Sequence, residues 1–397
     1  MTRTIRIFVC TVLTMLVLVA CDAPVDVPGG EPVATEPTPA VVEAPEAVPA
    51  PESPLSAQSP LAPPQVQPLA QDYVRPDGPH LLFSSARDEA RAGVRGWYLL
   101  NLDSEEVLPA PVTNLDGLTV NSLSWVDELS LFIAQMTDAQ NHSNLYLLDF
   151  AGAIVGQLTY DAFEAGNADY SAETELFVYV CLIQDLDICV TAANDPGLLN
   201  LTALNTREAG PQWSPDGETV LFVSNAAGVV NVWAVDADGA NRRNLSAVGL
   251  DGALREEGDA SWSPDGESIL FRATADGNAE IYLMDADGEN RRNLTENPAN
   301  DANPVWSPDG SYIAFRSDRD EGQDIYVLDP ATGDVVNVTN TPQTRENNFV
   351  WSVDSTQIVF DAQVDDVFDI YVVNVDGSDV RNLTNSPADD LDPQWVE

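Results

Sequence analysis

The sequence contains no lysine and only two histidines, so its 17 basic residues are all arginine, against 64 aspartates and glutamates. The formal net charge is −47. Nucleic acids and anionic membrane surfaces are bound through basic patches, so this charge excludes both as partners. It favours a soluble, self-repelling surface, or a partner that is itself cationic or basic.

Common catalytic motifs are missing as well. The chain has no G-x-S-x-G nucleophile elbow, no H-E-x-x-H and no P-loop pattern. His80 falls in an expected strand and His142 in the polar loop QNHSN, each away from any partner motif. Acidic residues are so abundant that no single pair stands out as a glycosidase pair. We therefore predict no catalytic residues.

Long apolar runs are confined to the N-terminus. MTRTIR carries two arginines, and the apolar run that follows is too short for a comfortable membrane span, which is typical of a signal peptide over residues 1–20. Leu18-Val19-Ala20-Cys21 resembles the bacterial lipobox, so Cys21 is the predicted lipid site. A plain secretory signal or an uncleaved anchor is the alternative. Residues 21–70, rich in Pro, Ala and Glu, predict a disordered tether, and residues 71–397 the folded domain.

Cysteine is scarce, with four in the chain. Cys10 lies in the signal peptide and Cys21 is the lipid site, which leaves Cys181 and Cys189 on adjacent expected strands. Outside the cytosol such a pair predicts a disulfide across one hairpin. Two free buried thiols are the alternative, and the absence of a nearby histidine disfavours a metal site.

One phrase is repeated along the chain. WSPDG occurs at 213–217, 262–266 and 306–310, becomes WSVDS at 351–355, and ends as Trp395. Tyr73, Trp125 and Tyr170 hold the same place earlier, so the spacings are 52, 45, 43, 49, 44, 45 and 44 residues. Self-similarity near 45 residues predicts a propeller or a solenoid.

Each repeat reads as four strands. From Asn303 these are NPVWS, SYIAFRS, DIYVLD and VVNVTN, separated by Gly- and Asp-containing turns. The third strand is apolar at odd and even positions, which indicates a sheet covered on both faces, as in a propeller blade. No helical period appears in 71–397. We predict an all-β fold of seven four-stranded blades, closed when DPQWVE joins the blade begun by HLLFSS at 80–85. The alternative is that QDYVRPDG supplies that strand.

The pattern WSPDG…IAFRSDRD…DIYVLD…RNLT resembles the WD-like repeat of TolB-type β-propellers from bacterial envelopes, most closely over 206–397. This resemblance implies an envelope protein that binds partners rather than catalysing. The chain differs from the best-known member because it lacks a separate N-terminal α/β domain, has seven units rather than six and carries its own predicted lipid anchor.

Loops between the second and third strands, and between repeats, are long and varied, and variable loops on a rigid scaffold commonly bind. They emerge at one end of the ring, so we predict binding there or at the mouth of the central channel, with Asp318, Asp320 and Asp365 as candidates. The D-x-D-G segments at 236–239 and 285–288 fit hairpin turns better than calcium loops. No cofactor is expected, with calcium as the alternative.

The sequence thus predicts a monomeric, lipid-anchored envelope scaffold without catalytic activity. Its partner would be an envelope protein, basic or cationic in character, and its contact with the bilayer would be the acyl anchor alone. A carbohydrate-active or hydrolytic propeller and a calcium-binding structural propeller are the alternatives.

Overall fold

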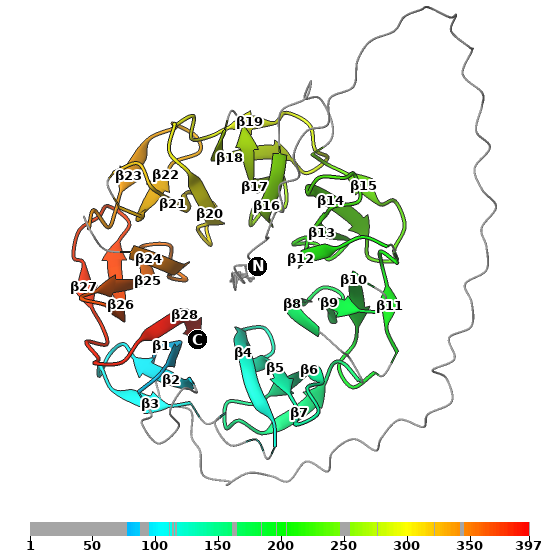
Figure 1. Cartoon of the computed structure of the whole chain (residues 1–397), viewed down its shortest axis with the longest axis horizontal. Coiled ribbons are helices and arrows are strands. Elements are labelled where there is room, and N and C mark those ends of the chain that lie inside the picture. Colours follow the sequence, from blue (N-terminus) through cyan, green and yellow to red (C-terminus); the bar gives the residue numbers. More distant parts are fainter. Residues whose placement is uncertain are drawn as a thin grey trace, which may run out of the picture. The chain divides into compact units, whose positions relative to one another are not determined.

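The computed structural model describes residues 78–396, apart from 88–94, 111, 113–114, 116, 161–164, 184, 196, 204, 247–254, 276, 321 and 342–344. The predicted signal peptide, the tether, Cys21 and Tyr73 lie outside the described residues. The strands form seven four-stranded antiparallel sheets, arranged as blades around a ring (Figure 1). The predicted seven-bladed propeller is therefore confirmed.

The blades are numbered here in chain order, each from its inner to its outer strand. Blade 1 has β28(Asp390–Val396), β1(His80–Ser85), β2(Gly96–Asn101) and β3(Val107–Pro109); blade 2 has β4(Thr119–Val126), β5(Leu131–Thr137), β6(Ser143–Leu148) and β7(Ile154–Gln157). Blade 3 has β8(Ala165–Ser171), β9(Leu176–Leu182), β10(Leu186–Thr191) and β11(Leu199–Asn200); blade 4 has β12(Glu208–Trp213), β13(Thr219–Ser224), β14(Asn231–Asp236) and β15(Arg243–Asn244). Blade 5 has β16(Arg255–Trp262), β17(Ser268–Ala275), β18(Asn278–Asp285) and β19(Arg292–Asn293); blade 6 has β20(Asp301–Trp306), β21(Ile313–Ser317), β22(Asp324–Leu328) and β23(Val335–Asn337). Blade 7 has β24(Arg345–Trp351), β25(Gln357–Val364), β26(Val367–Asn374) and β27(Arg381–Asn382).

The ring is closed by the C-terminal strand. β28 is antiparallel to β1, with Leu81 opposite Trp395 and His80 opposite Val396. Trp395 thus completes the blade begun by HLLFSS, as predicted. Closure removes the unpaired inner edge that β1 would otherwise expose, and such edges are a common source of aggregation.

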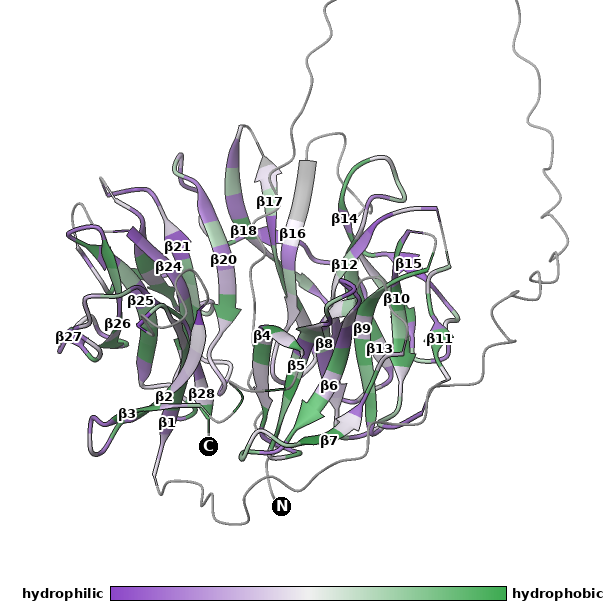
Figure 2. Ribbon diagram, turned by 60° about the horizontal axis from the view of Figure 1, so that its bottom comes forward, coloured by the Kyte–Doolittle hydropathy of each residue, from purple (hydrophilic) through white to green (hydrophobic). Residues whose placement is uncertain are grey.

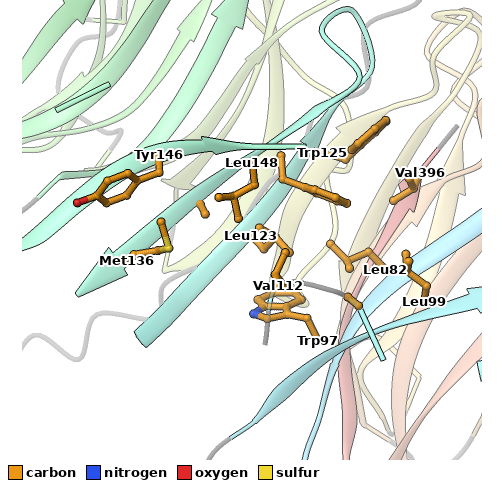
Figure 3. Close-up of a cluster of buried hydrophobic side chains, with 13 residues drawn as sticks. Leu82, Trp97, Leu99, Val112, Leu123, Trp125, Met136, Tyr146, Leu148 and Val396 are labelled. Carbon is orange, nitrogen blue, oxygen red and sulfur yellow. The ribbon is translucent and has the colours of Figure 1, made fainter. Parts of the chain in front are cut away.

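Apolar side chains cover both faces of the blades. All five residues of β22 are buried, which explains why its sequence is apolar at odd and even positions. Between blades 1 and 2, Leu82, Leu99 and Val396 pack against Leu123 and Trp125 (Figure 3). The core is therefore a series of such layers between neighbouring blades, and every blade depends on the next one for burial.

The repeated phrase has a local cause. In WSPDG, Trp213 is fully buried while the Ser214 hydroxyl donates to the Asp216 carboxylate (2.5 Å). The Ser214 oxygen accepts from the Thr219 amide (3.0 Å), and Gly217 has a φ of 73°. The phrase therefore places one buried aromatic residue and one hydrogen-bonded turn in each of blades 4, 5 and 6. Within the described residues, no helix is long and apolar enough to cross a membrane.

Candidate binding surface at the loop end

Alternating strand direction gives the ring two different ends. We call the loop end the one that carries the connections between second and third strands and between blades. The turn end carries the SPDG-type turns and the turns between third and fourth strands. At the loop end the β17–β18 hairpin rises above its neighbours (Figure 2), and its strands have eight residues each, against five in β21 and β22.

The three predicted binding residues all lie at this end. Asp318 follows β21, and its carboxylate accepts hydrogen bonds from the backbone amide (2.7 Å) and side chain (3.0 Å) of Asn300. Asp320 accepts from the Tyr326 hydroxyl at 2.6 Å. Asp365 is in the tight turn after β25, with a φ of 52°. Asp318 and Asp320 share one loop of blade 6, and Asp365 belongs to blade 7. Asp318 and Asp320 form local hydrogen bonds, Asp365 is exposed, and binding by the three residues stays a prediction.

Exposed apolar side chains at the same end were not singled out from the sequence. Ile183 and Val229 lie in the loops between second and third strands of blades 3 and 4, and Val364 ends β25 of blade 7; they are 50%, 45% and 41% exposed. Val364 is followed directly by Asp365 and Asp366, both exposed. The blade 7 hairpin therefore presents apolar and acidic groups together.

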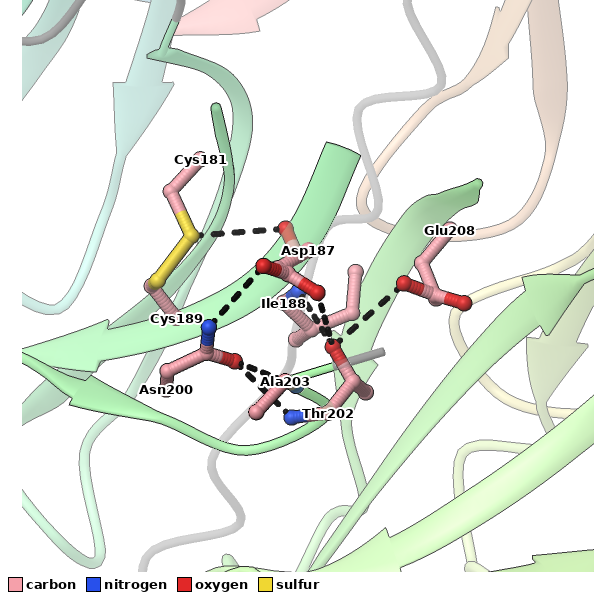
Figure 4. The surroundings of a disulfide bond; sticks show 8 residues. All are labelled: Cys181, Asp187, Ile188, Cys189, Asn200, Thr202, Ala203 and Glu208. Carbon is pink, nitrogen blue, oxygen red and sulfur yellow. Dashed lines mark hydrogen bonds between the residues drawn. A yellow bond between two sulfur atoms is a disulfide. The ribbon is translucent and has the colours of Figure 1, made fainter. Parts of the chain in front are cut away.

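One of these loops is held by a disulfide. Cys181 in β9 and Cys189 in β10 are joined in the structure, with Cα atoms 5.9 Å apart (Figure 4). Both side chains are buried and pack with the core between blades 2 and 3. The disulfide therefore fixes the base of the hairpin that exposes Ile183.

Four inner strands have a buried acid as their first or second residue, and the sequence analysis did not identify these acids. Glu208, Asp301, Glu346 and Asp390 are fully buried, and each precedes the tryptophan of its repeat by five residues. Burial raises the pKa of the Glu208 carboxyl, although hydroxyls of Ser224 (2.8 Å) and Thr206 (2.6 Å) donate to it. The signal in the sequence is the recurrent acid in EAGPQW, DANPVW and DLDPQW.

Two of these acids are paired with an arginine from the loop end. Arg319 donates to both carboxylate oxygens of Asp301 at 3.0 Å, and its guanidinium lies over the Tyr326 ring, 4.6 Å from the centroid. Arg87 forms an ion pair with one carboxylate oxygen of Asp390, at 2.5 Å. Burial nevertheless raises the pKa of Asp301, because the loss of hydration outweighs the nearby cation. These pairs anchor loops to the blades.

The two histidines belong to different blades and do not form a common site. His80 is buried, with Nδ1 2.8 Å from the Gly78 carbonyl and Nε2 3.1 Å from the Asn101 amide nitrogen. His142 Nδ1 lies 3.0 Å from the Asp138 carboxylate in an exposed loop. The two lie in different blades, and their contacts are those of structural residues.

The D-x-D-G segments are turns between the third and fourth strands. The carboxylates of Asp238 and Asp287 accept from the backbone amides two residues later, at 2.8 and 2.9 Å. Gly239 and Gly288 have φ values of 86° and 91°, as hairpin turns of this kind require. In the part of the chain that the structure describes, no three His, Cys, Asp or Glu side chains gather as a metal site.

Both the sequence and the fold resemble those of known proteins. The family model of the TolB beta propeller domain matches residues 253–395, which correspond to blades 5–7 and the closing strand. Residues 253–395 are therefore similar to the TolB beta propeller domain. Among curated proteins, none matches the sequence.

Solved structures show the same fold at low identity. An oligogalacturonate lyase from Vibrio parahaemolyticus is 16% identical over 72% of this chain and 84% of its own, with a TM-score of 0.57. A puromycin-hydrolyzing peptidase from Mycobacterium tuberculosis is 15% identical over 73% and 50%, with a TM-score of 0.54. The propeller domain of the Trilobed protease from Pyrococcus furiosus, described as having an open velcro topology, is 9% identical over 78% and 98%, with a TM-score of 0.56. The propeller described here is closed by β28. These similarities concern the fold alone.

Proposed function

We propose that this TolB-like propeller is a non-catalytic, lipid-tethered protein of the bacterial cell envelope, and that its loop end binds a protein partner with basic and apolar residues. The observation that carries the proposal is the exposure of Ile183, Val229 and Val364 on three loops of that end. Apolar side chains at the tips of a rigid scaffold lose water only when a partner covers them.

Charge supports the same partner chemistry. The chain has a net charge of −47, and the exposed Asp318, Asp320, Asp365 and Asp366 lie on the loops of blades 6 and 7. A basic partner would be attracted from a distance and oriented by these carboxylates, while apolar contacts would supply most of the affinity. The predicted Cys21 anchor and tether would hold the propeller away from the membrane to which it is attached.

The proposal is tested by capture from native membranes. The triple variant I183S/V229S/V364S removes the exposed apolar tips without changing charge. We expect the partner recovered with the unmodified chain to fall about tenfold or more with this variant, because contacts of this kind are worth 1–3 kcal/mol each.

The matched control is V155S/L199S/V336S. These side chains are 42%, 46% and 46% exposed but lie on the outermost strands β7, β11 and β23. Capture should be unchanged with this control. Equal capture by both triple variants would reject the loop end, and hydrolysis of an envelope polymer by the purified protein would reject the non-catalytic assignment.

A further inference from the structure

Several of the described arginines form an ion pair with a carboxylate. Ion pairs are present at Arg87, Arg95, Arg243, Arg272, Arg319 and Arg381. Arg242, Arg291 and Arg292 instead contact backbone carbonyls. Arg316 and Arg345 likewise have no described carboxylate oxygen within 4.0 Å, and they are set apart by lying at one junction between two blades.

These two arginines belong to the same junction between blades. Arg316 is on β21 of blade 6, and its Nη1 donates to the backbone carbonyl of Asn347 on β24, the inner strand of blade 7, at 3.5 Å. Arg345 begins β24 and pairs with Gln323 of blade 6 through an isolated parallel bridge. β20 and β24 are neighbouring inner strands that border the middle of the ring (Figure 1). Both guanidinium groups therefore belong to the inner part of the loop end.

Their charges act against each other. Burial and the positive charge of Arg345 together lower the pKa of Arg316, whereas Asp259, Asp361 and Glu346 act in the opposite direction. An arginine does not lose its proton under physiological conditions, so the repulsion is not relieved by titration. Arg345 is exposed and Arg316 is half-buried, so both side chains are in contact with solvent.

The neighbouring side chains are amides. Asn303 is the bulge residue of β20, with a φ of 55°, and follows Ala302, which pairs with Arg316. Asn347 provides the carbonyl that Arg316 contacts. Both side chains are half-buried, and neither is hydrogen-bonded to another described side chain. An amide both donates and accepts, which suits hydroxyl groups next to an anion.

We propose that Arg316 and Arg345 form a binding site for the carboxylate of a small hydroxylated organic acid, with Asn303 and Asn347 beside it. A guanidinium is planar and matches a carboxylate with two parallel N–H donors. A single negative charge is favoured over a phosphate dianion or a polyanion, because the net charge of −47 repels the latter more strongly. This site goes beyond the proposed protein scaffold and does not use its apolar tips.

The test is a titration of the full chain with D-glucuronate at constant ionic strength, followed by ligand-observed NMR. D-glucose, which lacks the carboxylate, and inorganic phosphate are titrated in parallel. We expect glucuronate to bind, glucose not to bind and phosphate to bind more weakly. R345Q should weaken glucuronate binding about tenfold, as the loss of one charge-assisted contact implies, and R316Q should weaken it further.

The control variant is R381Q, because Arg381 is on the outer strand β27 of the same blade and its substitution changes the net charge equally. It should bind like the unmodified chain. Arg316 is partly buried, so if R316Q does not fold, the exposed R345Q decides. Equal binding by R345Q, equal binding of glucose, or tighter binding of phosphate would each overturn the assignment. The loop-tip variant I183S/V229S/V364S should retain glucuronate binding, which separates this site from the proposed partner surface.

Discussion

The carboxylate of Asp361 accepts a hydrogen bond from the backbone amide of Asp392 at 3.0 Å, across the seam where blade 7 meets the closing strand β28. Asn348 joins the two acids, because its side-chain nitrogen donates to Asp361 at 3.2 Å and to Asp392 at 2.8 Å. Asp361 is fully buried. The closure of the ring thus depends on a carboxyl group that is removed from water.

The stability of the protein should therefore depend on the proton of Asp361. Burial, followed by the nearby charge of Asp392, raises the pKa of Asp361 to about 7 from an ordinary value of 3.8. The folded state binds this proton more tightly than the unfolded chain, so the free energy of unfolding falls as the pH rises from 4 to 7. D361N should remove this contribution, worth at most about 4 kcal/mol, and should be more stable than the unmodified chain at pH 8.

Urea denaturation at pH 5 and pH 8 measures the effect. The control is D366N, which removes an equal charge from an exposed position in the β25–β26 turn. It should leave the difference between the two pH values unchanged. Equal loss of stability by D361N at both pH values would show that Asp361 is needed as a hydrogen-bond acceptor rather than as a titrating group.

The buried pair Arg319–Asp301 leads to a second prediction. R319Q leaves the fully buried Asp301 without its cation, and breaking such a pair typically costs about 3–5 kcal/mol. R319Q should lower the free energy of unfolding more at pH 8 than at pH 5, because protonation of Asp301 at the lower pH neutralises the buried charge. The double variant D301N/R319Q should recover much of the loss, because no charge is then left buried.

Thermal or urea unfolding of the two single variants and the double variant gives the coupling energy directly. R381Q is again the control, since Arg381 and Asp379 are 50% and 60% exposed and exposed pairs contribute little. An R319Q effect as small as that of R381Q would show that neither the ion pair of Arg319 nor its aromatic stacking stabilises the fold appreciably.

Much of the architecture could be predicted from the sequence. The tryptophan spacing, the two-faced apolar strands and the lone final strand DPQWVE specify seven blades and their closure, because each signal is local. The buried acids could not be interpreted in the same way. Glu208 and Asp301 precede their tryptophans by five residues, in segments that read as variable loops, and their burial depends on side chains far along the chain. Asp318 shows the opposite error. The sequence suggests a carboxylate available for binding, but in the structure this carboxylate accepts hydrogen bonds from Asn300, 18 residues earlier.

Reduction of the disulfide gives a third prediction. Cys181 and Cys189 are separated by eight residues, and the loop-closure model assigns a bridge of this length about 2.5 kcal/mol. Dithiothreitol should lower the free energy of unfolding by roughly this amount, as followed by tryptophan fluorescence in urea. The variant C181A/C189A should be insensitive to the reductant. If dithiothreitol also destabilised C181A/C189A, the loss of stability would not come from reduction of the Cys181–Cys189 disulfide.

Two glycines at the turn end allow a fourth, matched prediction. Gly288 and Gly333 both lie in turns between third and fourth strands, in blades 5 and 6, with φ values of 91° and 80°. A Cβ atom on Gly288 would lie 2.6 Å from the Leu245 carbonyl oxygen of blade 4, whereas one on Gly333 would meet no atom within 4 Å.

Both alanine variants impose the strain of a left-handed residue, about 1–2 kcal/mol. G288A must in addition move the backbone of the neighbouring blade, since a carbonyl oxygen cannot rotate away as a side chain can. We expect G333A to lower the melting temperature by a few degrees and G288A to lower it at least twice as far, as measured by calorimetry. Equal shifts would mean that adjacent blades can separate at the turn end without cost, and that the tight packing between blades does not extend to their turns.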